Sequence, residues 1–91
     1  MDAGVSFRVK GRVQGVAFRA FVQTTGRQFG IKGWVKNNAD GSVSGYAEGD
    51  KGLLVEFIKE LQIGNRWSSV EALEEEEHAF SGEFQSFEIR Y

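Results

Sequence analysis

The residues best suited to chemistry are a glycine-bearing loop and the arginine that follows it. The loop lies in residues 11–19, which read GRVQGVAFR. Gly15 lets the backbone bend so that successive N–H groups face inward and form an anion-binding nest. Arg19 would stand in the first turn of the following helix, where a cation is mildly unfavourable. An anion between the nest and the guanidinium explains that placement, although a tight turn with an exposed arginine is an alternative interpretation.

Two nucleotide-binding patterns are absent from this loop. No Gly-Lys-Ser or Gly-Lys-Thr follows it, and the chain contains no G-x-G-x-x-G. The sequence therefore has neither a P-loop nor a dinucleotide fingerprint. A nucleotide-dependent enzyme is not expected.

A second polar group lies in residues 33–43, which read GWVKNNADGSV. Asp40-Gly41 is a hairpin turn signal, so Asn37 would end one strand and could approach the loop if both strands share a sheet. Its side-chain amide offers donors and an acceptor that could hold a water molecule beside an anion. Spacing alone favours the simpler interpretation, in which Asn37 and Asn38 are only hairpin residues.

Charge is divided unevenly along the chain. The formal net charge is −2, from 11 basic and 13 acidic side chains. Residues 1–40 hold seven Lys or Arg and two Asp, a net charge of +5, whereas residues 41–91 hold four basic and eleven acidic side chains, a net charge of −7. This division indicates an anion site from which carboxylates are excluded, or chance together with an acidic solvated tail. Residues 74–77, all Glu, and His78 are expected to be solvated.

The composition narrows the possible functions. With 91 residues, the chain is expected to form a single domain over residues 1–91. It has no cysteine and one histidine, which excludes thiolate and multi-histidine metal sites. No apolar run approaches the ~18 residues of a membrane span, and no signal-peptide pattern begins the chain. We expect a cytoplasmic protein without a metal or another cofactor.

Hydrophobic periodicity predicts the elements that position these residues. Alternating apolar side chains predict strands at residues 5–13, 31–37, 42–48, 67–75 and 84–91. A spacing of 3.6 residues predicts helices at residues 18–30 and 50–64. The order β-α-β-β-α-β with a short extra terminal strand indicates a ferredoxin-like α+β sandwich, in which both helices cover one face of an antiparallel sheet.

The expected core includes both tryptophans and the phenylalanines. The second helix contributes an apolar stripe of Leu53, Leu54, Phe57, Ile58 and Leu61. Trp34 and Trp67 are expected to lie in the same core.

The two polar segments together resemble a known family. GRVQGVAFR at residues 11–19 is similar to the first signature of the acylphosphatases, and GWVKN at residues 33–37 is similar to the second. Gly41, Val43 and Gly49 match the continuation of the second signature. The ending FEIRY also resembles the family, so the likeness spans nearly the whole chain and favours a small stand-alone member. Ala17 replaces a frequent glycine.

The resemblance implies hydrolysis of an acyl phosphate to a carboxylate and inorganic phosphate. It assigns phosphate binding to Gln14, Gly15, Val16, Ala17, Phe18 and Arg19. It also implies that Arg19 stabilises charge on the phosphoryl group and that Asn37 orients the attacking water, which makes these two the expected catalytic residues. The expected partners are a small acyl phosphate and inorganic phosphate, with neither nucleic acid nor a membrane, and the expected state is a monomer.

Neither GRVQGVAFR nor GWVKN contains a histidine, a cysteine or an acid that could act as a general base. The phosphate group itself is therefore the expected acceptor of the proton of the attacking water. Arg19 and the nest would supply the positive charge that Mg²⁺ provides elsewhere. The alternatives are a module of the same fold that binds RNA or a phosphorylated ligand without catalysis, or a small-ligand sensor. The aromatic pattern of an RNA-binding platform is absent.

Overall fold

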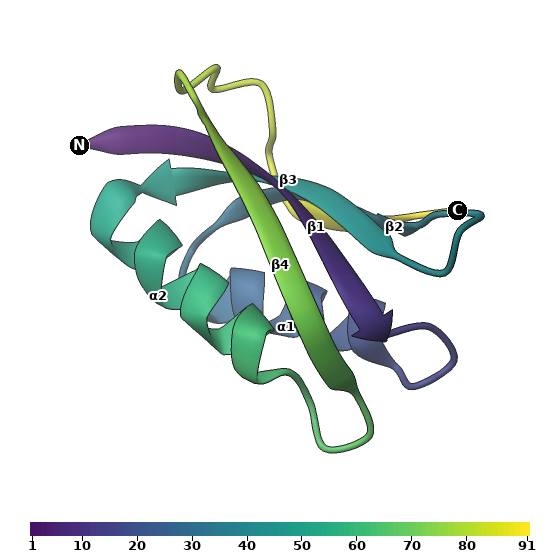
Figure 1. The fold of residues 1–91 in the computed structure, drawn as a ribbon. Helices are drawn as coiled ribbons and strands as arrows, with labels where there is room; N and C mark the ends of the chain where they lie inside the picture. The colour runs from purple at the N-terminus through teal and green to yellow at the C-terminus, as the bar shows by residue number, and fades with distance from the viewer.

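The computed structural model describes residues Met1 to Tyr91 as one sheet with both helices packed on one face (Figure 1). The elements follow the predicted order. They are β1 (Asp2–Arg12), α1 (Phe18–Gln28), β2 (Lys32–Asn37), β3 (Val43–Asp50), α2 (Lys51–Ile63), β4 (Ser69–His78) and β5 (Phe87–Arg90). Neither helix is long and apolar enough to cross a membrane.

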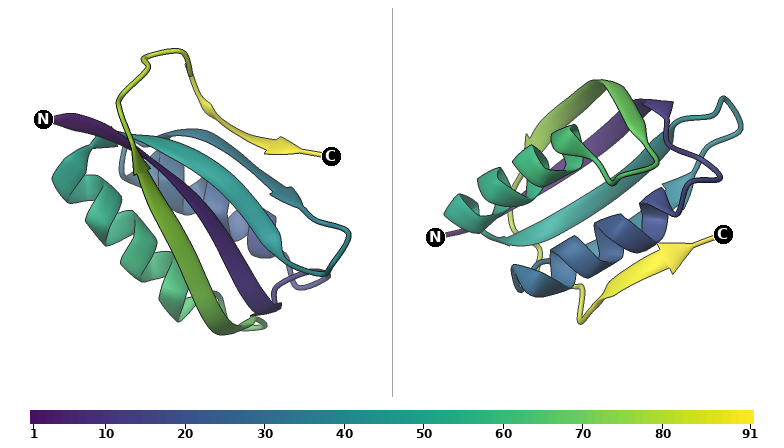
Figure 2. Two further views of the ribbon diagram at one scale, coloured as in Figure 1. Left: turned by 45° about the horizontal axis from the view of Figure 1, so that its top comes forward. Right: turned by 90° about the horizontal axis from the view of Figure 1, so that it is seen from below.

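The five strands form a single sheet in the order β4-β1-β3-β2-β5. β1 pairs antiparallel with β3 and β4, and β2 pairs antiparallel with β3. β5 pairs parallel with β2, from Gly33 opposite Phe87 to Lys36 opposite Arg90. The sheet is therefore mixed, whereas an antiparallel sheet was expected. Residues 79–86 explain the difference, because they carry the chain from β4 at one edge to β5 at the other (Figure 2).

The core lies between the helices and the face of the sheet that they cover. Alternation along β1 places Val5, Phe7 and Val9 on that face, and all three are buried. The rings of Phe7 and Phe57 pack edge to face, with centroids 5.9 Å apart. Sixteen buried apolar residues form this single cluster, and burial of apolar surface is the main driving force that holds helices to sheet.

Gly26 lets helix α1 approach the sheet closely. A Cβ atom added to Gly26 would lie 2.7 Å from Cδ2 of Phe87 in β5. Phe87 is 1% exposed and packs against Phe57, with ring centroids 5.8 Å apart. A glycine inside a helix costs about 0.5–1 kcal/mol relative to alanine. The close contact with Phe87 explains why a glycine is present at position 26 despite this cost.

Three predicted core side chains are exposed. Trp67 is 59% exposed because it lies in the turn before β4, where the guanidinium of Arg66 packs 5.3 Å from its ring centroid. Leu53 is 41% exposed because the first turn of α2 presents Leu54 to the core instead. Phe80 is 47% exposed in the connection between β4 and β5. Trp34 is half-buried on the uncovered face of the sheet.

Candidate active site

Residues 13–17 connect β1 to α1 and are anchored at two points. The side chains of Val13 and Val16 are buried in the core. Ten backbone hydrogen bonds lie outside the helices and strands, and none of them uses an N–H of residues 14–20 as donor. The first turn of α1 contains no acid, and no side chain caps it. The loop and the helix N-terminus therefore present several N–H donors to an anion.

The loop bends through two residues with positive φ. Gly15 has φ 74°, and Ala17 has φ 60° and ψ 26°, so both lie in the left-handed region. Ala17 is the only residue other than glycine with a positive φ. L-amino acids avoid this region, and strained angles of this kind cluster at functional loops.

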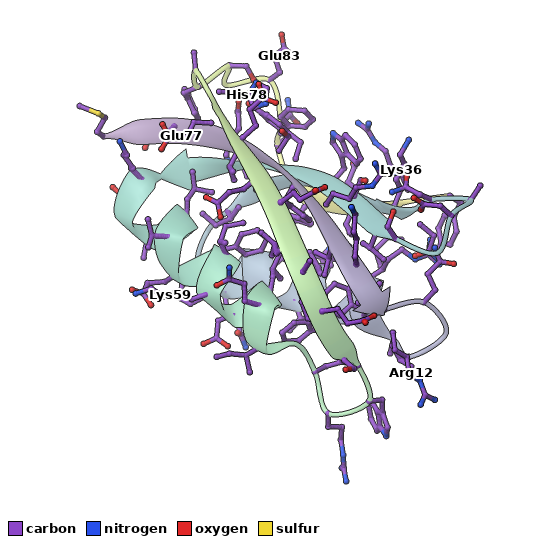
Figure 3. All side chains as sticks on the ribbon, viewed as in Figure 1. Arg12, Lys36, Lys59, Glu77, His78 and Glu83 are labelled. Atoms are coloured by element: carbon purple, nitrogen blue, oxygen red, sulfur yellow. The ribbon has the colours of Figure 1, made fainter.

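Arg19 is held by the last residue of β5 and by Tyr91, which follows it. Its Nη1 donates a hydrogen bond to the carbonyl of Arg90 at 3.1 Å, and its guanidinium lies 4.7 Å from the ring centroid of Tyr91. None of the four ion pairs of the protein involves Arg19, so its positive charge is available to a ligand. Arg12, in the same motif, is exposed and projects away from the fold (Figure 3).

Asn37 is the last residue of β2 and lies opposite Val43 of β3. Gln14 ties the loop directly to this hairpin, because its Nε2 donates to the carbonyls of Asn38 at 2.8 Å and Ser42 at 2.9 Å. The loop after β1, the turn between β2 and β3 and the C-terminus thus lie at one end of the sheet (Figure 1). Asn37 lines the same cavity as the loop, as expected if the two strands share a sheet.

The hairpin turn is rigidified by its own polar side chains. Asp40 accepts hydrogen bonds from the Ser42 hydroxyl at 2.6 Å and the Ser42 N–H at 2.9 Å. These bonds, followed by the charge of Arg8 at 3.1 Å, hold the pKa of Asp40 below its usual value of 3.8. Asn38 donates to the Ser42 hydroxyl at 2.9 Å. The turn that follows Asn37 is therefore fixed by several bonds.

These elements enclose a cavity of about 250 Å³. Its lining residues are Val13, Gly15, Ala17, Phe18, Arg19, Ala20, Asn37, Ile89 and Tyr91. Arg19 carries the only charged side chain among them, so the cavity is suited to a small anion. Gln14 and Val16 do not line it: the Gln14 side chain turns to the hairpin, and the Val16 side chain is buried. Phosphate binding by their backbone N–H groups stays a prediction.

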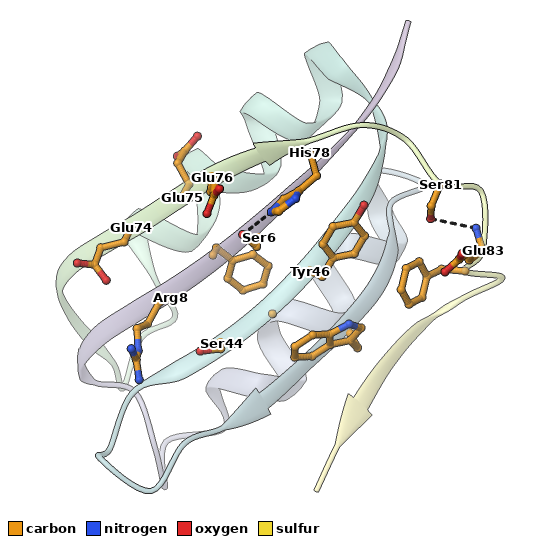
Figure 4. A pocket seen from close by; sticks show the side chains of 14 residues that line it. Ser6, Arg8, Ser44, Tyr46, Glu74, Glu75, Glu76, His78, Ser81 and Glu83 are labelled. Atoms are coloured by element: carbon orange, nitrogen blue, oxygen red, sulfur yellow. Dashed lines mark hydrogen bonds between the residues drawn. The ribbon is translucent and has the colours of Figure 1, made fainter.

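A larger hollow of about 680 Å³ lies on the uncovered face of the sheet (Figure 4). Tyr46 lies on its floor, and Glu74, Glu76 and Glu83 stand around it (Figure 4). His78 shares a hydrogen bond of 2.9 Å with Ser6 there. Residues 74–78 are exposed, as expected. Carboxylates repel anions, so a phosphate group is expected in the smaller cavity with Arg19 rather than in this hollow.

Comparison with known proteins decides the family. The sequence profile of the acylphosphatase family matches residues 5–89. The chain is 46% identical over 85 residues to an acylphosphatase of Pasteurella multocida, covering 93% of this chain and 94% of that protein. It is 43% identical over 83 residues to an acylphosphatase of Bacillus licheniformis, covering 91% and 92%. The chain belongs to the acylphosphatase family.

The fold of the solved acylphosphatases agrees with this assignment. The crystal structure of acylphosphatase from Bacillus subtilis superposes with a TM-score of 0.94 at 36% identity and covers all of both chains. The family resemblance, the ferredoxin-like sandwich and the assignment as an enzyme with acylphosphatase function are thereby confirmed.

Sequence reasoning missed several residues around the site. The contacts of Arg90 and Tyr91 with Arg19 join residues more than 70 positions apart. Asn65 donates through Nδ2 to the carbonyl of Val16 at 2.7 Å. No periodicity or motif marks Asn65, because its partner is a backbone atom in a distant loop. Only the packing of the turn between α2 and β4 against the loop brings these residues together.

Proposed function

We propose that this acylphosphatase hydrolyses acyl phosphates in the cavity shared by Arg19 and Asn37. The observation that supports this location is a single arginine, without an ion-pair partner, beside a loop whose N–H groups have no acceptor. The backbone N–H groups of residues 14–19 hold the phosphoryl oxygens. The guanidinium of Arg19 binds the same group and stabilises the negative charge that the transition state spreads over three oxygens.

Asn37 orients the attacking water in this proposal. The water oxygen forms the new bond to phosphorus, while the bond between phosphorus and the acyl oxygen breaks and the carboxylate leaves with the electron pair. The proton of the water passes to the phosphate group, because no Asp, Glu or His side chain lines the cavity to accept it. A carboxylate is a stable leaving group, so protonation by a general acid is unnecessary. The protein contributes position and electrostatic stabilisation.

Turnover of benzoyl phosphate in EDTA tests the proposal. Arg19→Ala removes the only cation of the cavity and is expected to lower kcat/KM by at least a factor of about 10²–10³. Asn37→Ala is expected to lower kcat more than it raises KM, because Asn37 acts on water rather than on the substrate. Arg12→Ala is the matched control, since Arg12 lies in the same motif but is exposed and does not line the cavity.

Circular dichroism of each variant separates loss of activity from loss of folding. Full activity of a folded Arg19→Ala variant would overturn the assignment of the cavity. Loss of wild-type turnover in EDTA with recovery on adding Mg²⁺ would overturn the metal-free mechanism. Phosphate binding without turnover would instead favour a module that binds phosphorylated ligands.

We also propose that the protein is a cytoplasmic monomer that acts on small acyl phosphates. The chain has no cysteine and hence no disulfide bond, as is usual for proteins of the cytoplasm. Arg19 and Asn37 line the same cavity within one chain, so the proposed site needs no residue from a second copy. Light scattering after size exclusion is expected to give a mass near 10.2 kDa, and a dimer mass would contradict the monomer.

A further inference from the structure

The peptide between Val16 and Ala17 is the central unit of the phosphate loop. Gly15 and Ala17, on either side of Val16, both have positive φ. Such a backbone is held by external contacts rather than by a regular hydrogen-bond ladder. The Val16 side chain is 8% exposed and fixes one end of this peptide in the core. The remaining freedom is rotation of the peptide plane, which decides where the Ala17 N–H points.

Asn65 fixes that plane from the other side of the loop. Its Nδ2 donates to the Val16 carbonyl at 2.7 Å, across 49 positions of sequence. A trans peptide is planar, and its C=O and N–H point in opposite directions. The Val16 carbonyl faces Asn65, so the Ala17 N–H faces away from it. Ala17 borders the cavity with Arg19, and its N–H takes part in none of the backbone bonds outside the helices and strands.

We propose that Asn65 is a positioning residue for phosphate binding, an inference that rests on the proposed function of the cavity. Its hydrogen bond to the Val16 carbonyl turns the Ala17 N–H toward the phosphoryl group. Asn65 does not line the cavity itself. It acts through the peptide that it holds.

The surroundings of Asn65 match this role. Its backbone N–H donates to the Ser68 hydroxyl at 3.0 Å, and its carbonyl accepts from the Ser68 N–H at 3.1 Å and the Ser68 hydroxyl at 3.0 Å. The turn therefore presents the Asn65 amide in one orientation. Its Oδ1 is buried without a hydrogen-bond partner, which is unfavourable for folding. The donor atom is satisfied and the acceptor atom is not, so the amide is placed for its bond to Val16.

Two substitutions of Asn65 and one control test the proposal. Asn65→Leu has similar volume and no donor, and Asn65→Asp keeps the shape but replaces the donor with an oxygen. Ser68→Ala is the control, because it removes both Ser68 hydroxyl bonds of the turn and leaves the Asn65 side chain intact. Binding of inorganic phosphate is measured by titration calorimetry, and the Ala17 amide resonance is followed by NMR.

Both Asn65 variants are expected to raise the Kd for phosphate roughly tenfold, the scale of one misplaced hydrogen bond to a charged group. KM for benzoyl phosphate rises in parallel, and kcat changes less, because Arg19 and Asn37 are untouched. The Ala17 amide resonance moves in both Asn65 variants before phosphate is added. Asn65→Leu changes the urea midpoint little, since it also removes the unpaired Oδ1. If Asn65 were merely structural, its substitution would instead lower the free energy of unfolding and leave the affinity for phosphate unchanged.

Phosphate affinity within about twofold of wild type in both folded Asn65 variants would overturn the proposal. So would an equal loss of phosphate affinity in Ser68→Ala, since the turn rather than the amide would then be responsible. A wild-type protein that neither binds phosphate nor hydrolyses benzoyl phosphate would overturn the proposed function. In that case the Ala17 resonance alone decides whether Asn65 holds the peptide.

Discussion

Ala17 is the one residue other than glycine whose φ is positive. Its φ of 60° lies in the left-handed region, which costs an L-residue about 1–2 kcal/mol that glycine does not incur. Glycine is more flexible in the unfolded chain, which offsets about 0.5–1 kcal/mol of that gain. Ala17→Gly is therefore expected to raise the free energy of unfolding by a few tenths to about 1 kcal/mol, as measured by urea denaturation.

Ala20→Gly is the matched control for Ala17→Gly. Ala20 is also exposed, but it lies within α1, where glycine costs up to about 1 kcal/mol. The two Ala→Gly changes are thus expected to have opposite signs. Equal destabilisation by both would show that the left-handed angle of Ala17 is not strained.

Single residues differ in how well the sequence alone revealed them. Arg19 could be predicted, because a cation in a first helical turn is unusual in itself. Asn37 was ambiguous from spacing and gained its role only from the resemblance. Phosphate binding by the backbone N–H of Gln14 stays a prediction, and no motif indicated that its side chain binds the hairpin carbonyls. No sequence motif or periodicity indicated Asn65, because a side chain that binds a backbone carbonyl can do so whatever residue carries that carbonyl.

Among the elements, α1 packs most tightly against β5 at the contact between Gly26 and the ring of Phe87. Gly26→Ala would gain helix propensity of about 0.8–1 kcal/mol, but the new Cβ would meet the Phe87 ring at 2.7 Å. Overpacking of a core costs about 1–3 kcal/mol. We therefore expect Gly26→Ala to lower the free energy of unfolding, measured by urea denaturation.

A double-mutant cycle with Phe87→Leu identifies the cause. Phe87→Leu alone leaves a cavity and is destabilising. The smaller side chain makes room for a Cβ at position 26, so the double variant should be more stable than the sum of the single changes predicts. Strict additivity would mean that Gly26 is required for a reason other than Phe87.

The helices and strands and their order along the chain could be predicted from the sequence. The direction in which β5 pairs and the strands that form the edges of the sheet could not. The alternation of Phe87, Ile89 and Tyr91 indicated a strand but contains no information on which neighbour it pairs with or in which sense. Pairing with β2 follows from the path of residues 79–86 across the uncovered face of the sheet (Figure 2). The same crossing places Phe80 in solvent, so the prediction of a buried phenylalanine was wrong there.

At the scale of the whole molecule, one buried carboxylate fastens that crossing to the sheet. Glu48 in β3 is 2% exposed. It accepts hydrogen bonds from the Tyr46 hydroxyl at 2.6 Å, from the N–H and hydroxyl of Ser81 at 2.7 and 2.6 Å, and from the Gly82 N–H at 3.1 Å. Sequence analysis did not single out Glu48, because a charged residue in a strand is normally solvated. The pH dependence of stability should expose its role.

Burial alone would raise the pKa of Glu48, but the hydrogen bonds from Ser81, Tyr46 and Gly82 outweigh it and hold the pKa below the usual 4.5. The carboxylate therefore stabilises the fold above pH 4.5, and this contribution is lost as the pH falls through the lowered pKa. Other acids titrate in the same range. The informative quantity is thus the difference in unfolding free energy between wild type and Glu48→Gln, which should shrink as the solution is acidified.

Tyr46 provides the alkaline half of the same prediction. Burial, followed by its hydrogen bond to Glu48 and the charge of that carboxylate, raises the pKa of Tyr46 from 10.0 to about 12. A raised pKa in the folded state means that the stabilising contribution is complete below pH 10 and is lost as the pH rises toward 12. Urea denaturation should therefore show that the difference in unfolding free energy between wild type and Tyr46→Phe declines above pH 10.

In Tyr91→Phe, where Tyr46 is the only tyrosine, the phenolate absorbance should rise with a midpoint near pH 12. A midpoint near 10 in the folded protein would show that Glu48 and Tyr46 do not share a buried hydrogen bond, and the crossing would then need another anchor.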